Sequence, residues 1–166
     1  KDSDNLIKLL GFSNSIVAKE ILKSISPTLN FEVGHIASLP ILNNLEGISN
    51  INILQAIELS KEDWNENELS WEFKSNSLFN QINNSKKNLK ESFKILRKKW
   101  EERNLNLKSI EEKINHELIS AYKLESQLKE EVELKEVSLN SNPRYRYGDK
   151  ISIENAENNL LQDTLK

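Results

Sequence analysis

The fold of this chain is decided by residues 89–114, which read LKESFKILRKKWEERNLNLKSIEEKI. Steps of three and four place side chains on one face of an α-helix, and a regular series of such steps is typical of a heptad seam. We therefore expect a helix that makes its core contacts along this face. The seam residues are Leu89, Phe93, Leu96, Trp100, Leu107, Ile110 and Ile114.

The heptad pattern continues outside this stretch in both directions. It begins near Ile82 and runs less strictly to Leu124, and polar residues interrupt it at Lys86, Arg103 and Glu117. An unbroken helix from Asn80 to Leu124 would be about 65 Å long, at ~1.5 Å per residue. Alternatively, residues 104–106 (Asn-Leu-Asn) form a turn between two antiparallel helices, and both arrangements remain open.

The N-terminal region predicts two short helices followed by a small β element. Gly11 suits the end of the first helix, Ser13 or Ser15 the N-cap of the second, and Pro27 blocks its continuation. A short strand with alternating apolar residues (Leu29, Phe31, Val33) is expected to end at Gly34, and a second extended piece covers His35 to Ile41. The apolar residues at helical spacing are Leu6, Leu9, Leu10, Ile16, Val17, Ile21 and Leu22.

Between the β element and the seam the pattern is mixed. Apolar residues between Ile48 and Ile57 predict a short helix, and Ser60 with Asp63 has the spacing of a capping box. Three large aromatic residues in an acidic stretch predict an irregular segment held against a neighbouring surface. They are Trp64, Trp71 and Phe73. After the seam, we expect a loop at residues 142–148 and a final helix with Ser152 as its N-cap.

Composition sets the fold class. Hydrophobic residues make up 37% of the 166 residues, charged residues make up 30%, and only 4 Gly and 3 Pro occur. These values favour an elongated helical protein with a thin core over a turn-rich β architecture. The expected fold is mainly α, with a long helical hairpin or coiled-coil-like helices and a small β element near residues 29–41.

Four regions are expected. Residues 1–42 would end a recognition-like module, and residues 43–77 would form a linker held by its aromatic residues. Residues 78–128 would form the heptad-patterned helical spacer, and residues 129–166 a loop followed by the terminal helix. Since the sequence begins at Lys1 and has no Met, we expect a fragment of a longer chain.

Catalytic and metal-binding patterns are missing from the sequence, so no catalytic or metal-ligating residue is predicted. There is no Cys, no Gly-rich phosphate loop and no histidine pair with ligand spacing. His35 and His116 stand alone, and a solvated histidine is the better interpretation of each. No apolar run approaches the ~20 residues that span a bilayer, so no membrane partner is expected.

Two basic features are candidates for DNA contact. Lys86, Lys90, Lys94 and Arg97 are spaced by three or four, which predicts one stripe along a helix that could follow a phosphate backbone. The alternative is a solvated helix face. The residues from Arg144 to Tyr147 alternate cations with aromatics. Arg144 and Arg146 would either contact phosphates or pair with acids while the tyrosines pack on the helical body.

Several stretches, in order, resemble the large adenine-specific DNA methyltransferases of BREX phage-exclusion systems (PglX-like) and related type II restriction-modification methylases. Together they cover nearly the whole chain. They are residues 9–15, 26–36 with 39–41, 59–64 with 70–73, 117–122, and 142–148 followed by 163–165.

The resemblance implies a parent protein that transfers a methyl group from S-adenosylmethionine to the amine of adenine in DNA. The parent's Gly-rich cofactor motif has no counterpart here. Residues 142–145 are partly similar to its catalytic Asn-Pro-Pro-Tyr/Phe motif, but Arg144 replaces the second Pro, so neither catalysis nor cofactor binding is carried over to this chain.

The resulting hypothesis is a non-catalytic, recognition-adjacent helical fragment that positions the catalytic and recognition parts on DNA. Its expected partners are the rest of the methyltransferase, DNA and proteins of the defence system, and its expected location is the cytoplasm. The alternative is a structural coiled-coil module that self-associates or docks a partner protein. A third hypothesis is direct DNA binding by the lysine stripe and the Arg144–Arg146 segment.

Overall fold

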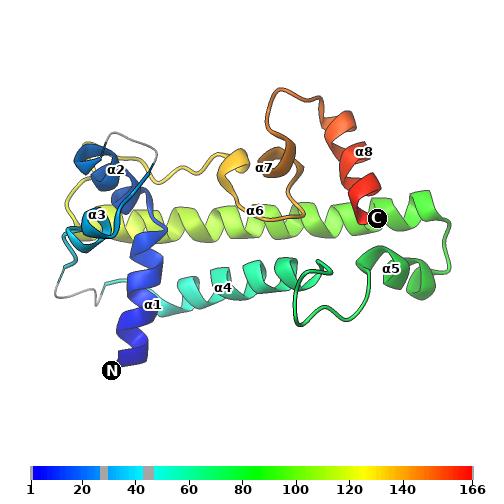
Figure 1. Ribbon diagram of the computed structural model, residues 1–166, viewed down its shortest axis with the longest axis horizontal. Coiled ribbons are helices and arrows are strands. Elements are labelled where there is room, and N and C mark those ends of the chain that lie inside the picture. Colours follow the sequence, from blue (N-terminus) through cyan, green and yellow to red (C-terminus); the bar gives the residue numbers. More distant parts are fainter. Residues whose placement is uncertain (1, 27–29, 43–46, 166) are drawn as a thin grey trace. The chain divides into compact units, whose positions relative to one another are not determined.

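A computed structural model describes residues 2–26, 30–42 and 47–165 (Figure 1). In this part of the chain the prediction of a mainly α fold is confirmed. The helical elements in chain order are α1 (Asp2–Ser13), α2 (Ile16–Ile25), α3 (Val33–Ala37), α4 (Asn50–Asn65), α5 (Ser77–Ser85), α6 (Leu89–Ala121), the 3-10 turn η1 (Leu134–Glu136), α7 (Pro143–Tyr147) and α8 (Ile153–Thr164).

The predicted β element is wrong wherever the structure describes it. Residues 30–41 contain no strand, and Val33 to Ala37 form helix α3. A reciprocal capping box starts this helix, in which the backbone N–H of Glu32 donates to Nδ1 of His35 at 3.1 Å. Such a cap satisfies backbone groups locally, and this outweighs the short alternation of apolar residues. Leu29 lies outside the described residues.

Two of the predicted N-caps are confirmed. The side chain of Ser15 accepts a hydrogen bond from the backbone of Ala18 at the start of α2, and Ser152 accepts one from Asn155 at the start of α8. The capping box predicted from Ser60 is wrong, because that residue lies inside α4.

Gly11 does not end the first helix, which continues to Ser13. A Cβ atom on Gly11 would lie only 2.6 Å from Cδ1 of Ile53, a buried residue of α4. The glycine therefore permits a close approach between α1 and α4. Its role is in packing and not in helix termination.

The helix expected from Asn80 to Leu124 is broken at Lys86 and ends at Ala121. This residue has a left-handed backbone (φ 51°) and ends α5, and the side chain of Asn88 then accepts from the backbone of Glu91 in the first turn of α6. The alternative turn at residues 104–106 is wrong, because those residues lie inside α6. The 33 residues of α6 make a helix of about 50 Å.

The chain divides into two compact units, each built from two separate segments. Unit 1 contains residues 1–56 and 110–131, and unit 2 contains residues 57–109 and 132–166. The two units are defined by packing, whereas the four regions expected from the sequence are defined by role. The division into four regions therefore stays a prediction. None of the helices in the described ranges is long and apolar enough to cross a membrane.

In unit 1, α1 and α2 pack against the end of α6. The rings of Phe12 and Tyr122 stack with their centroids 5.4 Å apart. The hydroxyl of Tyr122 donates to the carbonyl of Pro40 at 2.7 Å, and burial raises the pKa of Tyr122. Glu117, one of the polar interruptions of the seam, accepts hydrogen bonds from the backbone of Ser49 (2.8 Å) and the side chain of Asn52 (3.1 Å).

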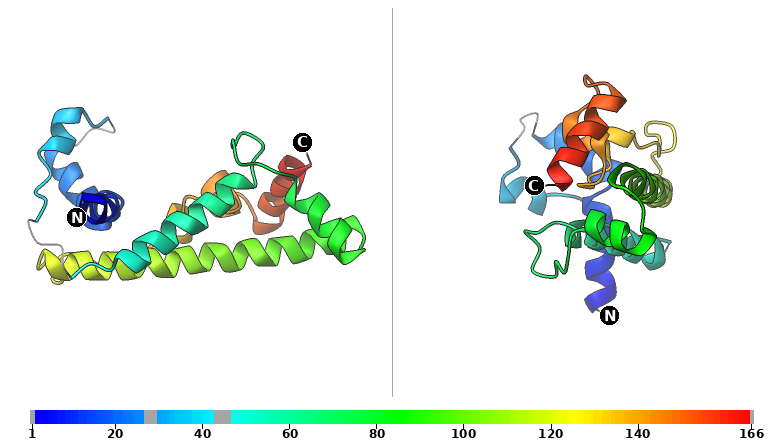
Figure 2. Two further views of the ribbon diagram at one scale, coloured as in Figure 1. Left: turned by 90° about the horizontal axis from the view of Figure 1, so that it is seen from below. Right: turned by 90° about the vertical axis from the view of Figure 1, so that its right-hand side faces the viewer.

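In unit 2, α5 and α8 pack on the first part of α6, as the views in Figure 2 show. The core of this unit is formed by Leu78, Leu96, Trp100 and Leu160. The rings of Phe93 and Trp100 meet edge to face, with centroids 6.3 Å apart. This core forms the apolar base beneath the polar cavity described next.

Candidate functional site

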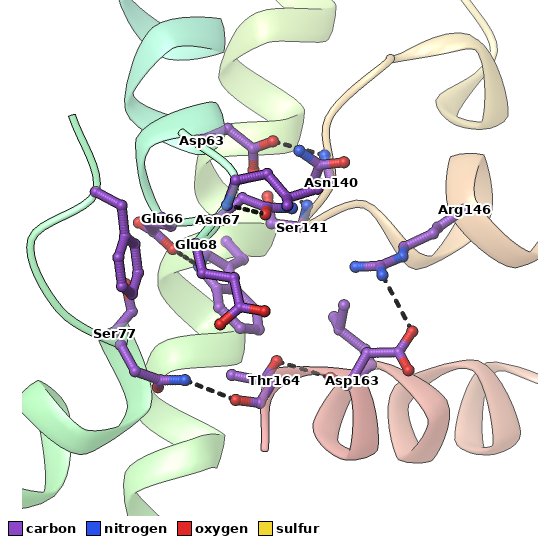
Figure 3. A pocket seen from close by; sticks show the side chains of 15 residues that line it. Asp63, Glu66, Asn67, Glu68, Ser77, Asn140, Ser141, Arg146, Asp163 and Thr164 are labelled. Atoms are coloured by element: carbon purple, nitrogen blue, oxygen red, sulfur yellow. Dashed lines mark hydrogen bonds and ion pairs between the residues drawn. The ribbon is translucent and has the colours of Figure 1, made fainter. Parts of the chain in front are cut away.

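A cavity of about 270 Å³ lies in unit 2 (Figure 3). Trp100 and Leu160 give it an apolar base, and most of the other residues that line it are polar. The wall residues come from the end of α4 and the loop after it, the start of α5, the segment before α7, α7 itself and α8. They are Asp63, Glu66, Asn67, Glu68, Leu69, Phe73, Asn76, Ser77, Asn140, Ser141, Arg146, Asp163 and Thr164.

Two carboxylates of the cavity wall, Asp63 and Glu66, pair with a buried cation outside the lining. Arg103 is only 6% exposed, and its guanidinium lies 3.4 Å from the carboxylate of Asp63. Its other terminal nitrogen contacts the carboxylate of Glu66, which also accepts from the indole N–H of Trp100 at 2.7 Å. The charge that interrupts the heptad seam is therefore fully paired inside the unit, as a buried charge must be.

Asp63 extends this network to a third part of the chain. It is 4% exposed, and its two oxygens accept from the backbone N–H groups of Asn140 (2.5 Å) and Ser141 (3.1 Å) (Figure 3). One carboxylate thus joins α4, α6 and the segment before α7. Hydrogen bonds from backbone amides to a charged acceptor are among the stronger ones in proteins.

The opposite wall is formed by α7 and α8. Arg146 pairs with Asp163 at 3.1 Å, and the hydroxyl of Tyr147 donates to the same carboxylate at 2.7 Å. Burial, together with this hydrogen bond to Asp163, raises the pKa of Tyr147 to about 12. In a third contact, the side-chain amide of Asn76 donates to the carbonyl of Thr164 at 2.7 Å.

Where a loop was predicted, Pro143–Tyr147 form helix α7, with Asn142 as its N-cap and Gly148 as its C-cap. Asn142 is fully buried, its side-chain oxygen accepts from the backbone of Arg144, and its amide donates to the carbonyls of Leu134 and Val137, each at 2.7 Å. Pro143 follows at the first helical position, where a missing N–H costs nothing. The sequence contained this signal, because Asn before Pro is a strong helix start.

The alternating arginines and tyrosines of residues 144–147 were expected either to contact phosphates or to pack on the helical body and pair with acids. The structure agrees with the second alternative for two of the four residues. Tyr147 is half-buried and Arg146 pairs with an acid, as the packing alternative requires. Arg144 donates to the carbonyl of Ile151 at 3.1 Å, and Tyr145 is 50% exposed. Contact of Arg144 and Arg146 with DNA stays a prediction.

The four residues of the predicted basic stripe do not share a helix. Lys86 lies at the end of α5, whereas Lys90, Lys94 and Arg97 lie on α6. The three lysines are exposed, and Arg97 pairs with Glu157 of α8. Of the predicted stripe, only Lys90 and Lys94 are exposed lysines on α6. Their contact with DNA stays a prediction.

Most of the seam residues face the core of their own unit. Leu96, Trp100 and Leu107 are buried in unit 2, and Ile110 and Ile114 are buried in unit 1. The first two residues of the seam differ, because Phe93 is partly buried and Leu89 is 42% exposed.

The aromatic residues of the predicted linker behave differently from the prediction. Trp71 is completely exposed and Trp64 is 48% exposed, so neither holds the segment against a surface. Only Phe73 does so in part, by lining the cavity.

The carboxylates of this site act as acceptors for groups of the same unit. Asp63 and Glu66 pair with Arg103, and Asp163 pairs with Arg146. No group of acids and histidines in the described residues has the geometry of a metal site. The arrangement ties helices together through polar contacts. Its main signal in the sequence was Arg103 on the apolar seam, but the partners of Arg103 were not predicted.

Comparison with known proteins gives two relatives over most of the chain. The adenine-specific methyltransferase BrxX of Escherichia coli O9:H4 (strain HS) is 32% identical in an alignment of 168 positions that covers 99% of this chain. The adenine-specific methyltransferase PglX of Lacticaseibacillus casei (strain Zhang) is 32% identical over 141 residues, which cover 83% of this chain. The chain spans only 13% and 12% of these relatives' lengths. No family model matches it.

Proposed function

We propose that this chain, which belongs to the PglX-like adenine-specific methyltransferases of the BREX type, is a non-catalytic helical segment that positions the catalytic and recognition parts of such an enzyme on DNA. The observation that carries the proposal is the buried network of Arg103 and Asp63, which ties α4, α6 and the segment before α7 together. We propose that this network fixes one arrangement of these helices, a role that buried polar or ionic groups have in some proteins.

The state of Asn142 supports a non-catalytic role. It matches the Asn of the catalytic motif in the resemblance, yet here it is fully buried. Its side-chain amide and carbonyl are bonded to the backbone of η1, the residue after η1 and α7. A catalytic asparagine has to offer these same groups to an extruded adenine. We propose that methyl transfer and binding of S-adenosylmethionine belong to other parts of the enzyme.

The alternative of a self-associating coiled coil is less well supported. Five of the seven seam residues are at most 6% exposed within a single chain, so little of the seam is left to pair with a second helix. Sedimentation of the purified chain is expected to show a monomer.

A second proposal concerns DNA. Lys90 and Lys94 lie one turn apart on α6 and are exposed, so both are placed to neutralise phosphates. These contacts would help to orient the enzyme and would carry no sequence information.

The main proposal is tested by a chimera and by the isolated chain. We expect that this chain, exchanged for the matching segment of the E. coli relative, retains adenine methylation of genomic DNA, whereas deletion of that segment abolishes it. Calorimetry of the isolated 166-residue chain with S-adenosylmethionine should show no binding. Specific cofactor binding, methyl transfer by the isolated chain, or full activity after the deletion would each contradict the proposal.

A further inference from the structure

Helix α8 is acidic along its whole length. Residues 153–164 include three carboxylates and no basic residue. Two of these carboxylates pair with arginines that are candidates for DNA contact. Glu157 pairs with Arg97 of α6, and Asp163 pairs with Arg146 of α7 at 3.1 Å (Figure 3). One helix thus supplies the counter-charge for both arginines.

Arg97 continues the line of Lys90 and Lys94 along α6. Steps of four and three residues place these three side chains on one face of the helix. The two lysines are exposed, whereas Arg97 is held by Glu157 in a pair whose side chains are 39% and 24% exposed. The basic face therefore includes a third cation, and an acid of α8 contacts it.

Helix α8 is anchored by its apolar side more than by these ion pairs. Ala156 and Leu160 are 1% and 2% exposed, and Leu160 belongs to the core together with Leu96 and Trp100. Burial of a leucine side chain contributes more to stability than a partly exposed ion pair does. The ion pairs can therefore be removed while the helix stays in place.

A carboxylate of α8 and a phosphate of DNA would compete for the same arginine. A guanidinium donates to carboxylates and phosphates with the same fork of N–H groups. The N–H groups that contact Glu157 and Asp163 are therefore not offered to a phosphate. In addition, the two carboxylates repel the DNA backbone. Both effects weaken the attraction of DNA to this unit.

We propose that α8 is an autoinhibitory helix, whose carboxylates withhold Arg97 and Arg146 from phosphates and so limit the affinity of unit 2 for DNA. The proposal rests on the proposed contact of Lys90 and Lys94 with DNA, and it adds a control on the strength of that contact. Loss of the two ion pairs, and not displacement of the helix, would release the arginines.

Fluorescence anisotropy with a fluorescein-labelled DNA duplex and the intact 166-residue chain tests the proposal. Glu157→Gln with Asp163→Asn removes both charges and keeps the size of the side chains. This variant should bind the duplex roughly threefold to tenfold more tightly than the wild type, because two ion pairs no longer compete with phosphates. The slope of the logarithm of the binding constant against the logarithm of the salt concentration should steepen, by up to ~0.9 for each released arginine.

The matched control is Glu58→Gln with Glu62→Gln, which removes the same charge from exposed positions of α4 in the same unit. Its affinity for the duplex should stay close to that of the wild type. Glu157→Gln alone should give part of the gain, and it should give none in an Arg97→Gln background, where no guanidinium is left to release. Thermal unfolding should show that these variants remain folded, since the core contacts of α8 are unchanged.

Equal affinities of the wild type and the α8 double variant, or an equal gain in the α4 control, would overturn the autoinhibitory role. Lys90→Glu with Lys94→Glu separates this failure from a failure of the DNA contact. If that variant binds as tightly as the wild type, the DNA contact is wrong and the autoinhibitory role falls with it. If it binds less tightly while the α8 variant behaves like the wild type, only the autoinhibitory role is wrong.

Discussion

The guanidinium of Arg103 lies 3.4 Å from the carboxylate of Asp63, and both side chains are almost completely buried although 40 positions separate them in the sequence. Neither group is in water, so each depends on the other and on the neighbouring Glu66 for its stability in the folded state. The pair joins the middle of α6 to the end of α4, and its removal should disturb both.

Arg103→Met should lower the free energy of unfolding by about 3–5 kcal/mol, because it leaves Asp63 buried without its cation. The double variant Arg103→Met with Asp63→Leu should recover part of this loss, although the backbone N–H groups of Asn140 and Ser141 then lack an acceptor. Urea denaturation measures both. The control is Arg97→Met, which removes a partly exposed pair with Glu157 and should cost about 1 kcal/mol or less. Equal losses for Arg97→Met and Arg103→Met would contradict the assignment.

Gly11→Ala should lower the free energy of unfolding by about 1 kcal/mol. The energetic cost of the steric clash with Ile53 exceeds the gain from the higher helix propensity of alanine by this amount. Ile53→Ala removes both Cδ1 and Cγ1, which an added Cβ would meet at 2.6 and 2.8 Å, so that the same glycine substitution should cost less in that background. Thermal unfolding of the four proteins in this cycle gives the coupling energy.

Gly34 provides the control for Gly11. It lies inside α3, and no atom is within 4 Å of an added Cβ. Gly34→Ala should therefore stabilise the chain by about 0.5–1 kcal/mol, since only the gain in helix propensity remains. A loss of stability at Gly34 equal to that at Gly11 would show that the clash with Ile53 is not the cause.

Asn142→Asp should cost about 2–3 kcal/mol, because a carboxylate cannot donate to the carbonyls of Leu134 and Val137. Ser152→Ala removes only the cap of α8 and should cost about 1 kcal/mol. In the chimeric methyltransferase, Asn142→Asp should reduce methylation only as far as it reduces the folded fraction. Complete loss of activity in a fully folded Asn142→Asp protein would instead indicate a catalytic asparagine.

The phenol of Tyr147 should titrate at about 12, which ultraviolet absorbance of tyrosinate can follow. Since the pKa is raised above its unfolded value of about 10, the associated stability is present below pH 10 and is lost as the pH rises through 12. Asp163→Asn should lower this pKa only in part, because burial is the larger cause and remains. Tyr147→Phe is the control that identifies the signal. A Tyr147 titration near 10 in the wild type would contradict the buried contact.

Lys90→Glu combined with Lys94→Glu should weaken binding of duplex DNA by the methyltransferase. It should also reduce the slope of the logarithm of the binding constant against the logarithm of the salt concentration, by the amount that about two phosphate contacts contribute. Lys99→Glu with Lys113→Glu is a control of equal charge change on the same helix, away from the stripe, and its effect should be smaller if Lys90 and Lys94 face the DNA. A gel-shift assay at several salt concentrations measures both slopes. Identical slopes for the wild type and the Lys90/Lys94 variant would remove these residues from the DNA contact.

The long helix was predictable because its periodicity is a local property of many residues. The break at Lys86 was not, since a left-handed lysine has no strong signal of its own and the following Asn88 cap becomes informative only when the break is known. The prediction of a strand near Phe31 was wrong for a related reason. A capping contact between Glu32 and His35 stabilises a helix there, and the alternation of apolar residues was too short to outweigh it.

The polar site was visible from the sequence only as anomalies. Arg103 was recognised only as a polar interruption of the apolar seam, and its partners depend on how residues 63, 103 and 140 meet after folding. Asn142 and Pro143 were adjacent and formed a readable helix start that was assigned to a loop. Exposure of Trp71 was not predictable, because a tryptophan among acids is usually buried.

The arrangement of segments in the two compact units also sets the order in which the chain can fold as it is synthesised. Unit 1 needs residues up to 131, and unit 2 needs residues up to 166, because each closes only on its second segment. The N-terminal helices therefore leave the ribosome well before the end of α6 that covers them, and at ~5–20 residues per second this delay lasts several seconds. During that interval the ring of Phe12 lacks the ring of Tyr122, on which it stacks in the folded unit.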